Sequence, residues 1–161
     1  MKLIVAVDQN WGIGYKGNLL LRIPEDMRFF KEKTLNHVVI MGRGTYDSLP
    51  GQKPLPDRVN IVLSKNLSDN RVTICRSLSE LLETAEQYRP KELYVIGGES
   101  VYSLLLPYCT EAYITRIRQV FPADKHFKNM EEDPAWQLVS ESEWKYYGDI
   151  PYKFTTFKRV K

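Results

Sequence analysis

The sequence predicts a single α/β domain with a mostly parallel central sheet of about eight strands, an antiparallel C-terminal pair and about four flanking helices. Three observations predict this class. Apolar runs rich in β-branched residues recur along the chain, as in strands buried on both faces. Segments of helical period separate these runs. The last two strand patterns surround Gly148-Asp149 with no helix between them, which is typical of an antiparallel pair.

Length and composition set the class of protein. A chain of 161 residues fits one domain (1–161), and contents of 43% hydrophobic and 27% charged residues are ordinary for a globular protein. The net charge of +3 without a long basic run favours small anionic ligands over nucleic acid. Cys75 and Cys109 have neither metal-ligand nor disulfide-framework spacing. With no signal peptide or membrane-length run, we expect a cytoplasmic monomer without a membrane partner.

The first half of the chain alternates strands with glycine-rich loops. Residues 3–7 predict a buried strand, and residues 8–22 form a loop long enough to be a lid or a binding loop. A helix begins at Pro24, because a proline in the first turn lacks only an N–H that has no helical partner. The next predicted elements are strands at 37–41, 59–63 and 72–75, a short helix toward Leu49 and a proline-rich connector at 50–56.

The second half begins with a helix signal. Ser77-Leu78-Ser79-Glu80 fits the capping-box pattern, which predicts a helix through about residue 87. Further predicted elements are a strand at 93–96, a helix that ends near Pro107, a strand at 112–117, an irregular segment at 121–134, and strands at 136–146 and 152–160. No internal repeat interrupts this order, so the pattern remains that of one domain.

The helix that begins at Pro24 carries an acid in an unusual position. At about 100° per residue, Met27 and Phe30 lie on one apolar arc with Ile23, and Asp26 falls on its flank. A first-turn aspartate is also favoured by the helix macrodipole while fully solvated. The helical pattern therefore leaves open whether Asp26 is a solvated residue or a catalytic carboxylate in a cleft.

Two strands run directly into glycine and then a helix, at Met41-Gly42-Arg43-Gly44-Thr45 and Ile96-Gly97-Gly98-Glu99-Ser100. Backbone N–H groups at such turns bind phosphate, and the carboxyl ends of parallel strands face a common crevice. Neither turn matches G-x-G-x-x-G, so the standard Rossmann fingerprint is absent. We favour a nucleotide phosphate over two plain turns.

Basic residues follow other strands. Arg43, Ser64-Lys65 and Arg76 would form a cationic phosphate pocket if they converge, although their spacing alone favours solvated strand ends. Arg58 is either a clamp for a ligand carboxylate or a turn residue paired with Asp57. No H-x-x-x-H or C-x-x-C pattern is present, which argues against metal catalysis.

In their order and spacing, these segments closely resemble dihydrofolate reductase over essentially the whole chain. The matching segments are Ile4-Val5-Ala6-Val7, Gly12-Ile13-Gly14, Ile23-Pro24-Glu25-Asp26, Val39-Ile40-Met41-Gly42-Arg43, Pro54-Leu55-Pro56-Asp57-Arg58, Val62-Leu63-Ser64, Val95-Ile96-Gly97-Gly98, Val101-Tyr102 and Ile114-Thr115.

This resemblance implies reduction of 7,8-dihydrofolate by NADPH in one-carbon metabolism, with the loop 8–22 closing over the site. Asp26 would anchor the pterin with support from Thr115, and burial would raise the pKa of Asp26. Arg58 would bind the glutamate α-carboxylate. Other substrate contacts would be Ile4, Val5, Met27, Phe30, Leu49, Leu55, Ile96 and Tyr102. Cofactor contacts would be Ala6, Ile13, Gly14, Gly42, Arg43, Gly44, Thr45, Leu63, Ser64, Lys65, Arg76, Ile96, Gly97, Gly98, Glu99, Ser100, Val101 and Tyr102.

The chain departs from the family pattern in two places. Leu19-Leu20-Leu21 stands where the family commonly has leucine-proline-tryptophan, which removes an indole N–H near the substrate. Glu99 and Ser100 stand where glycine and arginine are frequent. The alternatives are a pyrimidine or pterin reductase of the same fold and a non-catalytic nucleotide-binding domain. Asp26 together with Arg58 favours folate.

Overall fold

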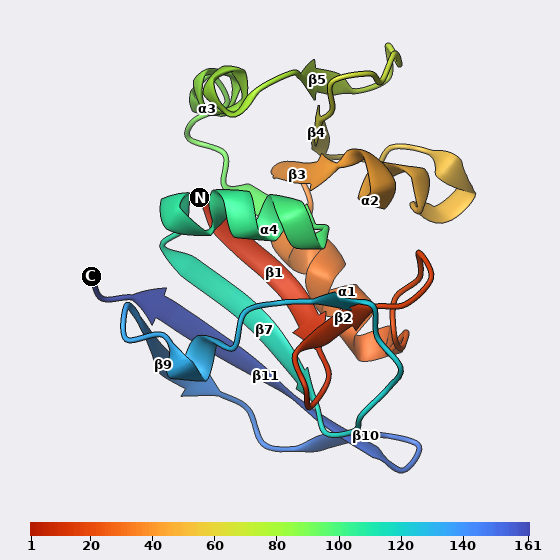
Figure 1. The fold of residues 1–161 in the computed structure, drawn as a ribbon, viewed down its shortest axis with the longest axis vertical. Helices are drawn as coiled ribbons and strands as arrows, with labels where there is room; N and C mark the ends of the chain where they lie inside the picture. The colour runs from red at the N-terminus through yellow and green to blue at the C-terminus, as the bar shows by residue number, and fades with distance from the viewer.

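One central sheet runs through the computed structural model, which describes residues 1–161 (Figure 1). Its strands follow the order β10-β11-β7-β1-β6-β3-β4-β5, and β9 also pairs with β11. The strands are β1 (Lys2–Val7), β3 (Val38–Gly42), β4 (Val59–Leu63), β5 (Thr73–Cys75), β6 (Leu93–Gly97), β7 (Glu111–Ile117), β9 (Trp136–Glu141), β10 (Lys145–Tyr147) and β11 (Ile150–Arg159). The helices are α1 (Pro24–Thr34), α2 (Arg43–Asp47), α3 (Leu78–Glu86) and α4 (Glu99–Leu105).

The pairing confirms the predicted fold class. All neighbours from β7 to β5 are parallel, and β11 is antiparallel to β7, β9 and β10. The strand predicted at 136–146 is in fact two strands, β9 and β10, on the same partner. The backbone ladder is interrupted between them because the N–H of Phe154 donates to the Oγ of Ser142 (3.0 Å).

Short elements occur within the segments that the sequence leaves irregular. The loop 8–22 contains β2 (Gly12–Gly14), which pairs with β8 (Lys125–His126) from the segment 121–134. Single 3₁₀ turns occupy Pro50–Gln52, Leu106–Tyr108 and Met130–Glu132. The β2–β8 pair matters for function because it joins two loops that are far apart in the sequence.

Alternating side chains give the sheet two covered faces. In β3, Val38 and Ile40 pack in the core cluster that includes side chains of α3 and α4, whereas Val39 and Met41 pack in a second cluster with Tyr46 of α2. Figure 1 shows α4 in front of the sheet and α1 behind it. This alternation has the period of two expected for a strand buried on both sides. None of the helices is long and apolar enough to cross a membrane.

The helix starts agree with the sequence signals. Pro24 occupies the first turn of α1, and Ser77 caps α3 by accepting a hydrogen bond from the N–H of Glu80 (3.1 Å). The Glu80 carboxylate accepts in return from the N–H of Arg76 (3.0 Å), one residue before the position that a capping box uses.

Strand register brings the predicted ligand-binding turns to one edge of the sheet. Gly42 pairs with Leu63, and Leu63 pairs with Cys75. On the other side of β3, Met41 pairs with Gly97. The residues that follow these strands therefore leave the sheet side by side at its carboxyl edge.

We expect Ile40→Ala to lower the free energy of unfolding by about 2–5 kcal/mol, because Ile40 is fully buried in the central strand β3 and its truncation leaves a cavity. Denaturant unfolding measures the change. Val139→Ala in β9 is the control, since this side chain is 47% exposed, and it should change the free energy by less than about 0.5 kcal/mol. Equal effects of the two substitutions would contradict this assignment of the core.

Candidate active site

Asp26 and Thr115 form the polar centre of the candidate site. Thr115 lies on β7, is 3% exposed, and donates its hydroxyl to Oδ1 of Asp26 at 2.6 Å. Burial raises the pKa of Asp26 and the adjacent Glu25 adds to the rise, while the hydrogen bond from Thr115 opposes it. Asp26 is thus a half-buried, hydrogen-bonded carboxylate and not a freely solvated first-turn acid.

The first turn of α1 is held by a second carboxylate. Glu25 accepts a hydrogen bond from the hydroxyl of Tyr152 (3.0 Å) and forms an ion pair with Lys145 (3.2 Å). These contacts hold down the pKa of Glu25. Tyr152 is buried in β11, so the turn that carries Asp26 is attached to the C-terminal strands.

The predicted substrate contacts and their neighbours are apolar and differ in burial. Ile23 is 2% exposed and packs with Tyr152, and Leu21 packs against the same cluster. Met27 is 44% exposed and free to meet a ligand. The other predicted substrate contacts are Ile4, which is buried, and Phe30, Leu49, Leu55 and Ile96, which are partly buried.

Val5 and Tyr102 enter the site differently from the residues around Asp26. The side chain of Val5 points into the core cluster shared with α4, so only its backbone is left for a ligand. Tyr102 is buried in α4 and donates its hydroxyl to the carbonyl of Ile4 at 2.7 Å. Burial raises the pKa of Tyr102 well above its ordinary range, so it stays a neutral donor.

Arg58 lies at the far end of α1 from Pro24. Its guanidinium donates to the carbonyl of Pro56 (2.9 Å) and to the hydroxyl of Thr34 (3.1 Å), and it forms no ion pair with Asp57. Partial burial lowers the pKa of Arg58 from its high ordinary value. With donors left over, this fixed guanidinium fits a carboxylate clamp better than a turn paired with Asp57.

The two glycine turns lie against each other and fit a phosphate-bearing cofactor. A Cβ added to Gly97 would lie 3.2 Å from the Thr45 hydroxyl, and one added to Gly42 would lie 2.9 Å from Val101. Gly97 also has a φ of 129°, a conformation that L side chains rarely adopt. Side chains are therefore excluded where the two turns meet, which leaves the backbone there open to the approach of a pyrophosphate.

Glu99 and Ser100, the two departures in the second turn, behave differently. The carboxylate of Glu99 accepts a hydrogen bond from the N–H of His126 in β8 at 2.6 Å, so its charge is turned toward that strand. Ser100 is exposed.

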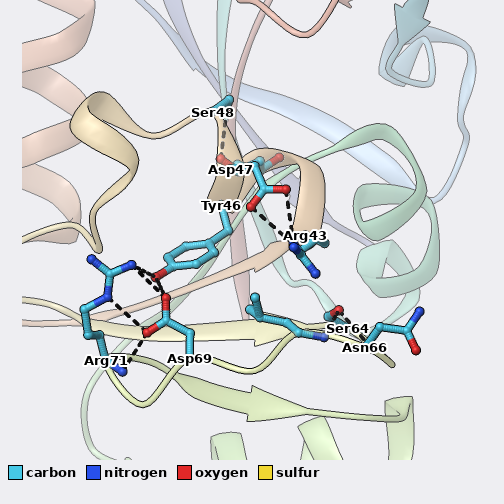
Figure 2. Close-up of polar contacts among 10 residues, drawn as sticks. Arg43, Tyr46, Asp47, Ser48, Ser64, Asn66, Asp69 and Arg71 are labelled. Carbon is cyan, nitrogen blue, oxygen red and sulfur yellow. Dashed lines mark hydrogen bonds and ion pairs between the residues drawn. The ribbon is translucent and has the colours of Figure 1, made fainter.

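The basic residues that follow the strands converge at the carboxyl edge. Arg43, Ser64 and Arg76 directly follow the paired residues of β3, β4 and β5, and Arg76 donates to the carbonyl of Ser64 (3.1 Å). Lys65 is exposed beside them. Figure 2 shows Arg43 turned toward Asp47 of its own helix, an ion pair of 3.1 Å with both side chains about half exposed.

A buried tyrosine fixes the loop behind this cationic edge. The hydroxyl of Tyr46 donates to Asp69 (2.6 Å), and Arg71 binds both carboxylate oxygens of Asp69 (Figure 2). These bonds hold the pKa of Asp69 well below its usual range. The loop 64–71 is thereby attached to α2, which keeps Ser64 and Lys65 beside Arg43.

The sequence did not identify the groups that fix the loop 8–22. Asp124 donates its N–H to the carbonyl of Gly14 (3.0 Å) and accepts from the N–H of Lys16 (3.0 Å). Asp8 is 1% exposed and accepts from backbone N–H groups of both loops. The available signal for Asp8 was a carboxylate at the end of a buried strand, directly before the glycine-rich loop.

We expect the free energy of unfolding to depend on pH, because the pKa of Asp26 is raised in the folded protein. The stabilising contribution of Asp26 is full below its ordinary pKa of 3.8 and is lost as pH rises through the raised value of the folded state. Asp26→Asn should therefore gain stability relative to the parent chain as pH rises. Urea unfolding of both proteins between about pH 4 and about pH 8 measures this difference.

Thr115→Val provides the matched comparison, because it removes the hydrogen bond that lowers the pKa of Asp26. The loss of stability with rising pH should therefore extend to higher pH in Thr115→Val than in the parent chain. A stability difference between parent and Asp26→Asn that stays constant across the range would refute the raised pKa.

Comparisons with known proteins agree with this geometry. The family model described as dihydrofolate reductase matches residues 1–159. Dihydrofolate reductase of Bacillus subtilis is 35% identical over 96% of this chain and 90% of its own length, and that of Drosophila melanogaster is 38% identical over 78% and 77%. The structure of dihydrofolate reductase from Enterococcus faecalis complexed with NADP(H) and RAB-propyl superposes with a TM-score of 0.88 at 31% identity, covering 99% of this chain and 96% of that one.

The match covers nearly the whole chain in both sequence and structure. This chain belongs to the dihydrofolate reductase family of NADPH-dependent oxidoreductases.

Proposed function

We propose that this chain reduces 7,8-dihydrofolate to 5,6,7,8-tetrahydrofolate with NADPH, and so supplies one-carbon metabolism. The observation that carries the proposal is the Thr115–Asp26 hydrogen bond of 2.6 Å, in a helical turn that also presents the exposed apolar side chain of Met27. A half-buried carboxylate with an exposed apolar neighbour suits a flat ring that offers adjacent N–H donors. The Arg58 guanidinium favours folate, because the glutamate of folate offers it a carboxylate.

Asp26 orients the pterin. Its carboxylate accepts hydrogen bonds from the 2-amino group and from N3 of the ring, while the hydroxyl of Thr115 holds Oδ1 in place. Because burial weakens competition from water, these bonds favour one ring orientation over others. Ile4 and Ile96 offer backbone groups to the pterin, and Phe30, Leu49 and Leu55 pack on the pterin and benzoyl rings.

When bound, NADPH supplies the hydride that C6 of the pterin receives. Ala6 and Ile13 hold the carboxamide of the nicotinamide, and Tyr102 lies near the junction of the two rings. The turns at Gly42 and Gly97 surround the pyrophosphate. Leu63 and Gly14 complete the lining of the cofactor site.

The proton at N5 comes from water, because the chain offers no acidic side chain at that atom. Leu21 lies in the apolar cluster with Ile23 and Tyr152 and has no N–H to anchor such a water. Asp26 does not reach N5, and its carboxylate affects the charge distribution of the pterin through the hydrogen bonds at N3 and the 2-amino group. Closure of the loop 8–22 keeps bulk water from the reacting atoms.

Arg43, Ser64, Lys65 and Arg76 select NADPH over NADH. Their convergence at the ends of β3, β4 and β5 supports a site for the 2′-phosphate, since guanidinium groups bind phosphate oxygens in pairs. Arg43 is held only by an exposed ion pair with Asp47, so it can turn to a phosphate at little energetic cost.

We also infer that residues 1–161 act as one domain and as a monomer in the cytoplasm. The continuous sheet and the shared core on its α4 side support a single unit. The folate substrate of the family is a small molecule, so no partner chain is required for binding.

Asp26→Asn is expected to lower turnover at neutral pH by about 10²-fold or more while NADPH binding stays nearly unchanged, because the amide cannot accept from both N–H groups of the pterin. Loss of NADPH absorbance on adding dihydrofolate measures the rate. Asp149→Asn, an exposed acid before β11, is the control and should keep full activity.

The same assay on the parent chain separates the rival functions. Consumption of NADPH with dihydrofolate, and much less with NADH, supports the proposal. Activity only with a pyrimidine substrate, or binding of NADPH without its oxidation, would refute it. Near-normal turnover of Asp26→Asn would remove Asp26 from its role.

Arg58→Gln is expected to raise the KM for dihydrofolate by about tenfold to hundredfold with a small effect on kcat, because it removes charge-assisted bonds to the glutamate. A dihydropterin without the benzoylglutamate should show no such rise. Arg89→Gln, an exposed arginine of the α3 side, is the control. Equal effects on the two substrates would contradict the clamp.

A further inference from the structure

Asp8 is a buried carboxylate that receives three backbone hydrogen bonds. Oδ1 accepts from the N–H groups of Asn10 (2.9 Å) and Gly12 (2.8 Å), and Oδ2 accepts from the N–H of Phe121 (3.0 Å). The side chain is 1% exposed. The two oxygens therefore serve different segments: Oδ1 serves the loop that follows β1, and Oδ2 serves the loop that follows β7.

None of the ion pairs of the protein includes Asp8. A buried carboxylate without a cation depends on its hydrogen bonds, so the three N–H groups are what makes the position tolerable. The same bonds support a strained turn, in which Trp11 has a φ of 61°. The carboxylate thus defines the conformation of residues 8–12.

The two loops that Asp8 joins have little room to move. Gly12 faces Asp8 and Ala123, and an added Cβ would lie 2.8 Å from the Cβ of Ala123 and 3.1 Å from Oδ1 of Asp8. The N–H of Gln9 also donates to the carbonyl of Gln119 (3.1 Å). Among these contacts, only the side chain of Asp8 binds both loops, and it uses a different oxygen for each loop.

Ile13 follows Gly12 directly, and Ala6 precedes Asp8 by two residues. In the proposed function these residues hold the carboxamide of the nicotinamide. A shift of the Asp8 turn would move Ile13 relative to Ala6 and would change the approach of the reacting carbons. A misplacement of about 1 Å is enough to cost about a hundredfold in rate.

We propose that Asp8 is a positioning residue of hydride transfer: its two oxygens fix the loop that carries Ile13 to the loop that carries Phe121. This inference rests on the proposed reaction. Asp8 touches neither substrate nor cofactor and acts through the backbone of its own loop. It should affect the chemical step more than the binding of dihydrofolate, which Asp26 and Arg58 hold.

Asp8→Asn tests the link between the loops specifically. Its remaining oxygen can still accept from Asn10 and Gly12, whereas its amide NH₂ would face the N–H of Phe121, donor against donor. We expect the hydride-transfer rate to fall by about tenfold to a hundredfold while the KM for dihydrofolate changes by less than about threefold. The primary isotope effect with deuterated NADPH should rise, since the chemical step becomes more strongly rate-limiting.

Asp133→Asn is the matched control. Asp133 also accepts a backbone hydrogen bond, from the N–H of Ala135 (2.9 Å), and its side chain is 12% exposed, but it lies at the far end of the segment 121–134 and none of its hydrogen bonds or ion pairs reaches residues 8–22. Both variants should lower the melting temperature. Only Asp8→Asn should change the rate and the isotope effect at a temperature where both are folded.

Gly12→Ala gives a second route to the same displacement without removing the carboxylate. Its Cβ should push the loops apart and slow hydride transfer, and Ala123→Gly in the same chain should restore part of the rate by removing the 2.8 Å contact. This pair decides the question if Asp8→Asn does not fold.

The proposal would be overturned if Asp8→Asn and Gly12→Ala both fold and both transfer hydride within about twofold of the parent rate. So would failure of both to fold, because the carboxylate would then serve folding alone. A parent chain that does not oxidise NADPH with dihydrofolate overturns the proposed function first, and that result is seen before any variant is made.

Discussion

The parallel register of β3, β4, β5 and β6 is the constraint on which the rest of the site depends. Gly42, Leu63 and Cys75 lie in one row across three strands, and Gly97 pairs beside the end of β3. Every chain direction is the same, so the segments after these strands must leave at one edge. A slip of one residue in any strand would turn its buried side chains to the opposite face. Burial of these side chains therefore fixes the register that positions the two glycine turns.

The candidate acid depends on a different junction, between α1 and the neighbouring strands β1 and β7. Ala6 pairs with Thr115, which directs the threonine hydroxyl to the α1 side of the sheet. Burial by this packing raises the pKa of Asp26, while Tyr152 and Lys145 take up the charge of Glu25 next to it. Two adjacent acids in one helical turn thus meet different surroundings. One is paired at the surface, and the other is half-buried with a single hydroxyl donor.

The loops form a third level of organisation. Loop 8–22 is fixed at its base by Asp8 and farther along by Asp124, and both use carboxylates that accept backbone N–H groups. Such bonds hold these parts of the loop in place without a hydrophobic core of their own. At the end of this loop Leu21, which stands where the family commonly has tryptophan, packs against the apolar cluster of Ile23. The departure from the family pattern is accommodated by packing, with no polar replacement.

Much of the architecture was fixed by local pattern. Buried β-branched runs, the proline at the start of α1 and the cap at Ser77 determined the element types and the α/β class, because each acts within a few neighbouring residues. The long run at 136–146 was misread as one strand, since the side-chain bond of Ser142 that interrupts its ladder has no local signature. The family resemblance supplied the roles of Asp26, Arg58 and the glycine turns, which helical periodicity and spacing had left open.

Only the tertiary structure decided which of these residues meet. The contact of Asp26 with Thr115 spans 89 positions, and that of Asp8 with Phe121 spans 113. Contacts of this kind depend on strand order and helix packing, and no sequence period encodes them. The sequence alone determined that carboxylates and glycines of the right type were present. The fold determined that Asp26 is half-buried beside a hydroxyl and that Asp8 joins two loops, because burial and hydrogen-bond partners exist only once the sheet has formed.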